Sequence, residues 1–245
     1  MSLTTRDAQL VRITIAIVIG DWDEVTRLRH ATPEEHIDRS WREAVLQTHL
    51  FAGFPRLVAA LEVLDQAGGL GSIDPEELET IADRPVSEVA KDAEQPDKGR
   101  DSEQVGAASA ASVELEPAAP AADRRGSELF DRIYAKGAAG VRSRLHELHP
   151  DFALWVAEHA YARVLARPGL AADRRELLAA AALIATRQDR QLASHARGAI
   201  RCGASPDELF ALLPLVQPYI DEDWFGRAKE ILQRFGKYEQ DHDDA

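Results

Sequence analysis

Apolar residues recur along this chain at three- and four-residue spacing, and they almost nowhere alternate with polar residues. The run Leu209, Leu212, Leu213 and Val216 is typical. Such spacing places apolar side chains on one face of a helix, whereas a half-buried strand requires alternation. The sequence therefore predicts an all-α fold. The expected helices are 4–19, 22–30, 33–51 and 54–67, followed by 127–146, 150–165, 172–187, 189–202, 206–217 and 220–235.

A long stretch without aromatic residues divides the chain. None occurs between Phe54 and Phe130, and residues 84–125 are rich in Ala, Pro, Glu, Asp and Ser. Such a segment buries too little apolar surface to offset its conformational entropy. The predicted organisation is a first half at 1–70, a largely disordered linker at 71–125 with a short helix at Pro75–Ile81, a second half at 126–236 and an acidic tail at 237–245.

The composition indicates which cellular compartment and which classes of partner to expect. The chain of 245 residues has a formal net charge of -13, which disfavours nucleic acid and anionic lipid as partners. Its one cysteine, Cys202, excludes an internal disulfide and is typical of a reducing, cytoplasmic compartment. The apolar run Ile13–Ile19 ends at Gly20 with no small-residue cleavage site after it, so neither a signal peptide nor a membrane span is expected.

Helix-start signals suggest an internal duplication. Gly20 is expected to end the first helix, and Asp21 to Glu24 to form a capping box for the next one. Thr32-Pro33-Glu34-Glu35 and Ser205-Pro206-Asp207-Glu208 each offer a hydroxyl N-cap, a proline at N1 and acid in the first turn. The same order of helices follows each signal, which favours duplication, although good caps also recur by chance.

Several longer motifs carry a family resemblance. The first half contains EAVLQTHLFAGFP at 43–55, and the second contains YARVLARPGL at 161–170, RELL at 175–178, HARGA at 195–199 and GAS at 203–205. These strings resemble the carboxymuconolactone decarboxylase family and its alkylhydroperoxidase D-like relatives. The resemblance implies a duplicated helical bundle whose C-terminal copy is the more complete. It also implies a homo-oligomer, for which we expect a dimer or trimer because each chain supplies two units.

The redox-active relatives carry Cys-x-x-Cys-x-x-x-His. Counted back from His195, the two thiol positions are Gln188 and Gln191. Glutamine forms no thiolate, so thiol peroxidase chemistry is excluded at this site. Cys202 lies seven residues after His195 and is expected to be a buried packing residue.

The resemblance also implies a proton-relay pair, Glu176 and His195. Each lies about nine or ten residues from an expected turn at Thr186–Gln188, so both would sit at one level of an antiparallel hairpin. A carboxylate beside an imidazole fixes its tautomer and favours general-base action. As structural alternatives, Glu176 completes a capping box with Asp173, and His195 donates to a backbone carbonyl.

Arg197, His49 and Gln191 are the predicted substrate-binding residues. A guanidinium clamps a carboxylate well, but Arg197 points about 160° away from His195 in an ideal helix. His146 and His149 lack a third ligand, so no metal site is predicted, and no cofactor motif is present. The prediction is cofactor-free proton transfer or decarboxylation on a small carboxylate or lactone. The alternative is a non-catalytic helical scaffold that has lost the site.

Overall fold

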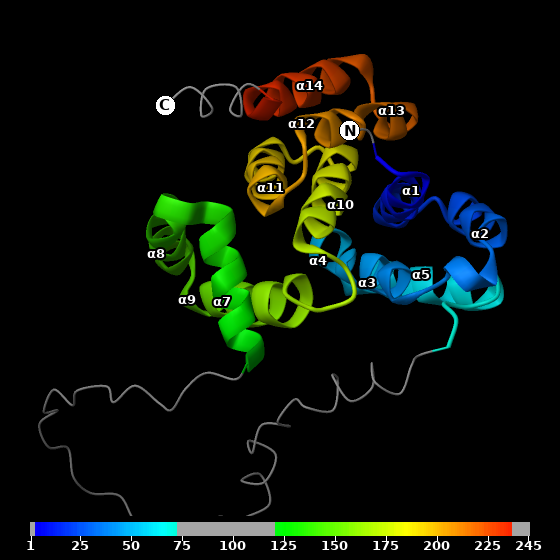
Figure 1. Cartoon of the computed structure of the whole chain (residues 1–245), viewed down its shortest axis with the longest axis horizontal. Coiled ribbons are helices and arrows are strands. Elements are labelled where there is room, and N and C mark those ends of the chain that lie inside the picture. The colour runs from blue at the N-terminus through cyan, green and yellow to red at the C-terminus, as the bar shows by residue number, and fades with distance from the viewer. Residues whose placement is uncertain (1–2, 73–120, 237–245) are drawn as a thin grey trace, which may run out of the picture. The chain divides into compact units, whose positions relative to one another are not determined.

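The computed structural model describes residues 3–72 and 121–236, and the regular elements within these ranges are all helical (Figure 1). The predicted all-α class is therefore confirmed. The first part contains α1 (Thr5–Ile19), α2 (Trp22–Ala31), η1 (Glu34–His36), α3 (Arg39–Gln47), α4 (His49–Ala52) and α5 (Phe54–Gln66). The second contains α7 (Ala121–Tyr134), η4 (Ala135–Gly137), α8 (Ala138–Leu148), α9 (Pro150–Trp155), the π-helix η5 (Val156–Leu165), α10 (Ala172–Ala185), α11 (Asp189–Cys202), α12 (Pro206–Phe210), α13 (Leu213–Val216), η6 (Gln217–Tyr219) and α14 (Glu222–Gly236).

Several expected helices are interrupted where local chemistry offers a cap or a turn. The helix predicted at 33–51 is divided into η1, α3 and α4, because the Asp38 carboxylate accepts from Ser40 N and Trp41 N and starts α3 afresh. The helix predicted at 127–146 begins earlier, at Ala121, and breaks at Ala135, whose φ is 46°. The helix predicted at 206–217 breaks between α12 and α13. The short helix expected at Pro75–Ile81, most of the linker and the tail lie outside the described residues.

Of the four predicted caps, two are correct, one is half formed and one is wrong. Gly20, with φ of 79°, ends α1 in the left-handed conformation, and Ser205 forms the full capping box with Glu208. Asp21 supplies half of a box by accepting from Glu24 N. Thr32 does not start a helix, because its hydroxyl donates to Leu28 O and closes α2. The parallel between the two helix starts is therefore incomplete, and duplication stays a prediction.

One apolar core joins elements from both sides of the undescribed segment 73–120. Helix α1 packs on α10, α10 packs on α11, and α11 packs on α14 (Figure 1). Ile13, Ile15 and Ile17 of α1 are fully buried, as is Ile184 of α10. Helix α1 is thus enclosed on several faces, which explains its nearly continuous apolar sequence. The apolar side chains Trp41, Ala44 and Val45 of α3 are also buried within the chain, so this face of α3 needs no second subunit.

A second, smaller cluster lies between α7 and η5. It contains Leu129, Phe130, Ile133, Tyr161 and Cys202. Helices α8 and α9 pack on each other and on α7 or η5. This arrangement leaves large apolar side chains of α8 and α9 in solvent, and they are Leu148, Phe152, Leu154 and Trp155.

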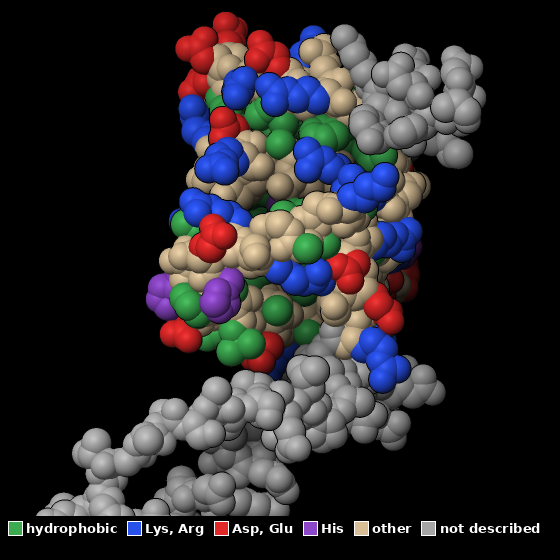
Figure 2. Space-filling model, turned by 90° about the vertical axis from the view of Figure 1, so that its left-hand side faces the viewer, with side chains coloured by type: hydrophobic (Ala, Val, Ile, Leu, Met, Phe, Trp, Pro, Cys, Tyr) green, Lys and Arg blue, Asp and Glu red, His purple; other side chains and the backbone are tan. Residues whose placement is uncertain are grey.

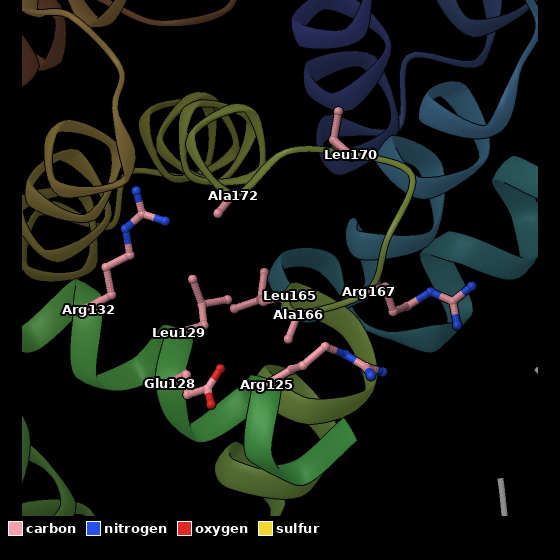
Figure 3. Close-up of a pocket in the computed structure, with 9 residues that line it drawn as sticks. All are labelled: Arg125, Glu128, Leu129, Arg132, Leu165, Ala166, Arg167, Leu170 and Ala172. Atoms are coloured by element: carbon pink, nitrogen blue, oxygen red, sulfur yellow. The ribbon is translucent and has the colours of Figure 1, made fainter. Parts of the chain in front are cut away.

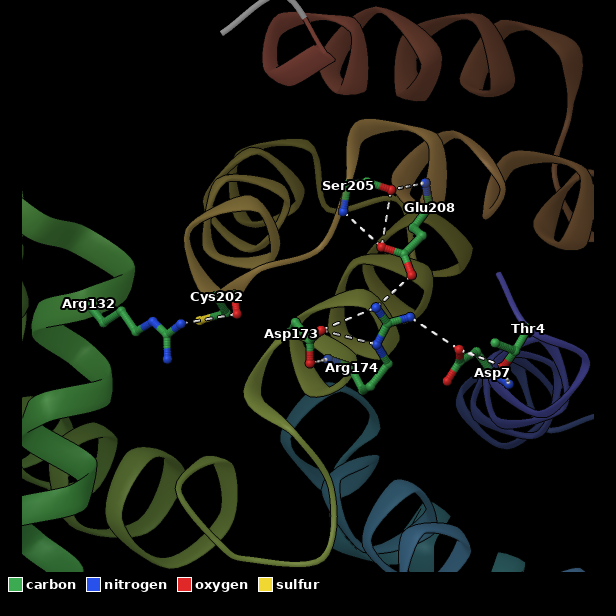
Figure 4. A network of polar contacts seen from close by, with 8 residues as sticks. All are labelled: Thr4, Asp7, Arg132, Asp173, Arg174, Cys202, Ser205 and Glu208. Atoms are coloured by element: carbon green, nitrogen blue, oxygen red, sulfur yellow. Dashed lines mark hydrogen bonds and ion pairs between the residues drawn. The ribbon is translucent and has the colours of Figure 1, made fainter. Parts of the chain in front are cut away.

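Buried ion pairs fix the N-terminal turn of α10. Glu43 of α3 accepts from Arg167 through both oxygens and from Arg175 at 2.8 Å. Arg174 pairs with Asp7 of α1 at 3.2 Å and with Glu208 of α12 at 2.6 Å (Figure 4). These contacts link the first-half motif to the RPGL and RELL motifs of the second half. They also hold rigid the helix that carries Glu176.

None of the helices within residues 3–72 and 121–236 is long and apolar enough to cross a membrane.

Candidate functional site

The helical hairpin of α10 and α11 brings Glu176 and His195 together. Glu176 Oε2 lies 2.9 Å from His195 Nδ1. Only three residues connect the two helices, so residues at equal distances from the turn face each other. The contact that the sequence predicted is therefore present.

The pair is asymmetric in its exposure. The Glu176 side chain is 1% exposed and the His195 side chain 17%. Because an ionised carboxylate can only accept, Nδ1 of His195 carries the hydrogen and Nε2 is left for another partner. No described residue forms a hydrogen bond with that Nε2. Glu176 Oε1 is also buried without a hydrogen-bond partner in the described part of the chain.

Gly198 makes room for the carboxylate. It lies three residues after His195 on α11, and a Cβ at this position would lie 2.3 Å from Glu176 Oε2. The same Cβ would lie 3.2 Å from Ile133 of α7. The glycine of the HARGA motif therefore has a physical explanation, because any larger residue would displace the acid that orients the imidazole.

Aromatic side chains enclose the pair. The Phe51 ring of α4 meets the His195 ring edge-on, with centroids 5.7 Å apart. Tyr161 donates to the Tyr134 hydroxyl at 3.4 Å. Burial raises the pKa of both tyrosines, and the nearby Glu176 charge raises it further. Both hydroxyls therefore stay protonated near neutral pH and can serve as donors.

Cys202 is buried at the end of α11. Burial, with the charge of Glu176, raises the pKa of its thiol to about 11. The thiol is thus protonated near neutral pH. This environment supports the prediction of a packing residue, because a reactive cysteine requires an accessible thiolate.

None of the three predicted substrate-binding residues forms a hydrogen bond, ion pair or ring contact with Glu176 or His195. His49 faces His159, with the two Nε2 atoms 2.8 Å apart, and stacks on Phe54. Arg197 is exposed and lies 5.6 Å from the centre of the Phe235 ring. Gln191 is exposed in the first turn of α11. The structure therefore gathers Glu176 and His195 and leaves the other three apart from them.

The capping alternative for Glu176 is wrong. The N-cap of α10 is Ala171, and Asp173 accepts from Arg174 N inside the first turn. Glu176 instead bonds His195. His149 has a capping role of its own, because its Nδ1 accepts from Phe152 N at the start of α9. Among the described residues no group of three or more His, Cys, Asp or Glu side chains could hold a metal ion.

Two cavities lie near α7. One of about 420 Å³ is lined by Arg125, Glu128, Leu129, Arg132, Leu165, Ala166, Arg167, Leu170 and Ala172 (Figure 3). The other, of about 860 Å³, lies between α7, α8, α9 and η5 and reaches Tyr161. Neither Glu176 nor His195 lines either cavity.

The structure thus belongs to the class of all-helical proteins in which an acid and an imidazole meet across a helical hairpin, here that of α10 and α11. Residues 150–228 match the model of the carboxymuconolactone decarboxylase family, so this region of the chain is similar to that family. The matched region contains α9 to α13 and both members of the pair. No curated protein matches the chain.

Sequence reasoning missed part of the surroundings of the pair. Gly198 stood within a recognised motif, but the motif alone gave no reason for a glycine. Tyr134, Tyr161 and Phe51 reach the site from other helices, and their spacing along the chain carries no signal of that contact.

Proposed function

We propose that this protein catalyses cofactor-free proton transfer coupled to decarboxylation of a small carboxylated or lactone substrate. The observation that carries the proposal is the hydrogen bond between His195 Nδ1 and the buried Glu176, which leaves Nε2 available. An imidazole fixed in one tautomer by a carboxylate is suited to general acid–base work near neutral pH.

The chemistry balances without a cofactor. The bond between the carboxylate carbon and its neighbour breaks, carbon dioxide leaves, and the electron pair stays on the neighbouring carbon, where an adjacent carbonyl delocalises it. Protonated His195 then delivers the Nε2 proton to that carbon. Glu176 stabilises the imidazolium before the transfer, and afterwards it still accepts the hydrogen bond from Nδ1–H of the neutral imidazole. The imidazole regains its proton from solvent, which its partial exposure allows.

Thiol chemistry has no support at this position. The two places where redox-active relatives carry cysteines hold Gln188 and Gln191. Cys202 keeps its proton near neutral pH because of its raised pKa. Proton transfer is therefore the reaction type that the pair itself can support.

A non-catalytic scaffold is the second candidate. It is favoured by one observation, namely that the two cavities near α7 are lined by neither Glu176 nor His195. Under this alternative the pair is a buried link between α10 and α11 with a structural role alone.

A screen of lactones and small carboxylic acids with wild type and His195→Ala distinguishes the two. We expect carbon dioxide release with wild type and a loss of about a hundredfold or more in the variant. Wild-type turnover that persists unchanged in His195→Ala would remove the proton-transfer proposal. Absence of any wild-type turnover across the screen would favour the scaffold.

We also propose that the protein is a cytoplasmic homo-oligomer, a dimer or trimer. Exposed Phe54, Val58 and Leu61 on α5, and exposed Phe152 and Trp155 on α9, support self-association, because large apolar side chains in solvent mark interaction sites. The single cysteine supports a reducing compartment. Roles for Arg197, His49 and Gln191 in substrate binding remain predictions.

A further inference from the structure

The smaller cavity carries a concentration of positive charge. Three arginines line it, Arg125, Arg132 and Arg167, and Glu128 is the only acid among the lining residues that the structure describes (Figure 3). The whole chain is strongly acidic, with a net charge of -13. Basic side chains are nevertheless spread over the face of the molecule in Figure 2. A cavity lined by arginines in an acidic protein favours an anion as its ligand.

Two of these arginines have no carboxylate partner within the described residues. Arg132 donates to two backbone carbonyls at the end of α11, those of Arg201 and Cys202, each at 3.2 Å. Figure 4 shows the contact with Cys202. Those acceptors are neutral, so neither hydrogen bond neutralises the guanidinium charge. Arg125 has no hydrogen bond or ion pair with a described residue. Arg167 differs, because its guanidinium turns out of the cavity to bond Glu43.

The cavity lies next to the acid of the proposed site. Ala172 lines it, and Glu176 follows one helical turn later on the same face of α10, about 6 Å along the axis. Leu129 also lines the cavity, and Ile133, one turn further along α7, approaches Gly198 beside the Glu176 carboxylate. One layer of apolar side chains thus separates the cavity from the pair.

The remaining walls suit an organic anion. Leu129, Leu165 and Leu170 give them an apolar surface that can contact a hydrocarbon chain or ring. The helix α10 begins at this cavity, and its N-cap, Ala171, provides no side-chain hydrogen bond. Within its first turn Asp173 accepts from Arg174 N, so the positive charge at the cavity comes from its arginines.

We infer that this cavity binds an organic anion, with Arg132 on one side and Arg125 on the other as the positively charged groups (Figure 3). As a substrate subsite the inference rests on the proposed function. It assigns carboxylate recognition to α7 rather than to Arg197, whose guanidinium lies over Phe235. The ligand class it names is a small monocarboxylate with an apolar body, held in a cavity that begins one helical turn before Glu176 on α10.

Calorimetric titration of the full chain with benzoate, and with neutral benzamide as the matched probe, tests this inference at low ionic strength. We expect saturable benzoate binding and benzamide binding about tenfold weaker or more, because only the anion gains charge-assisted hydrogen bonds. Arg125→Gln and Arg132→Gln should each weaken benzoate binding about fivefold or more and leave benzamide unchanged. The control Arg234→Gln removes one exposed positive charge on α14 and should bind like wild type.

Arg125→Gln carries the test on its own if Arg132→Gln unfolds, because Arg125 holds no described structural contact. Absence of saturable benzoate binding to wild type would overturn the inference, as would an equal loss in Arg234→Gln.

The same titration on His195→Ala separates this inference from the proposed function. Benzoate should bind that variant as it binds wild type, because His195 does not line the cavity. Arginine-dependent binding together with unchanged turnover in His195→Ala would leave the anion site standing and remove the proton-transfer proposal. Loss of turnover in His195→Ala without any benzoate binding to wild type would support the proton-transfer proposal and overturn the anion site.

Discussion

Replacing Gly198 with alanine should disturb the Glu176–His195 pair while leaving both residues in place. The new Cβ would lie 2.3 Å from Glu176 Oε2 and 3.0 Å from its carboxyl carbon. Carbon–oxygen contacts are normally about 3.3 Å or longer, so the oxygen must move by about 1 Å. That movement lengthens the present 2.9 Å hydrogen bond to His195 beyond bonding range.

The expected result is a large loss of activity with a small change in stability. A misplacement of about 1 Å at a catalytic group costs about a hundredfold in rate, so kcat/KM should fall by that factor. Alanine gains about 1 kcal/mol of helix propensity over glycine, while overpacking costs about 1–3 kcal/mol. The net loss in the free energy of unfolding is therefore about 0–2 kcal/mol.

Two assays follow the change. Turnover of whichever acid or lactone the screen identifies gives kcat/KM. Nitrogen-15 NMR of the histidines reports the His195 tautomer without any substrate, with the resonance assigned through His195→Ala. Gly140→Ala on α8 is the matched control, because a Cβ there meets nothing within 4 Å. Gly198→Ala with wild-type kcat/KM and an unchanged Nδ1–H signal would refute the reasoning.

Three further outcomes are expected. Glu43→Gln should lower the free energy of unfolding in urea by about 3–5 kcal/mol, because it leaves buried Arg175 without its carboxylate. Burial favours the neutral acid, but hydrogen bonds from Arg167 and Arg175 hold the pKa of Glu43 below its ordinary value. Wild type therefore loses the stability contributed by this carboxylate as the pH falls. The stability of Glu43→Gln should be less sensitive to acid. Iodoacetamide should label Cys202 slowly at pH 7, and the rate should rise about tenfold per pH unit up to pH 9, since burial raises its pKa to about 11; rapid labelling at pH 7 would contradict the account. Trp155→Glu should shift the oligomer toward monomer in gel filtration with light scattering, and a monomeric wild type would remove the oligomer proposal.

The sequence predicted the parts of the fold that local chemistry determines. Helix α11 was expected at 189–202 and spans Asp189–Cys202, because its periodicity is regular and Gly203, in the left-handed conformation, ends it. The Glu176–His195 contact was also predictable, because a hairpin with a short turn fixes which residues face each other.

The sequence could not predict features that depend on contacts between distant segments. The Thr32 hydroxyl could either cap a new helix or bond to the end of α2. In the structure it donates to Leu28 O in the last turn of α2, and no helix starts at Thr32. Arg132 and Tyr134 lie far from α10 and α11 along the sequence, so only the tertiary packing of α7 brings them near Glu176. Glu43 belongs to the motif at 43–55, but its two arginine partners lie more than a hundred residues away in the sequence, so the motif did not predict these ion pairs.

The central claim is that Glu176 and His195 act as one proton-transfer unit. A double-mutant cycle on kcat/KM, with Glu176→Gln, His195→Ala and the combined variant, tests it most directly. The account predicts that the combined variant is no slower than His195→Ala, because Glu176 acts only through the imidazole. A combined loss equal to the product of the two single losses would show that the residues act independently and would contradict the account.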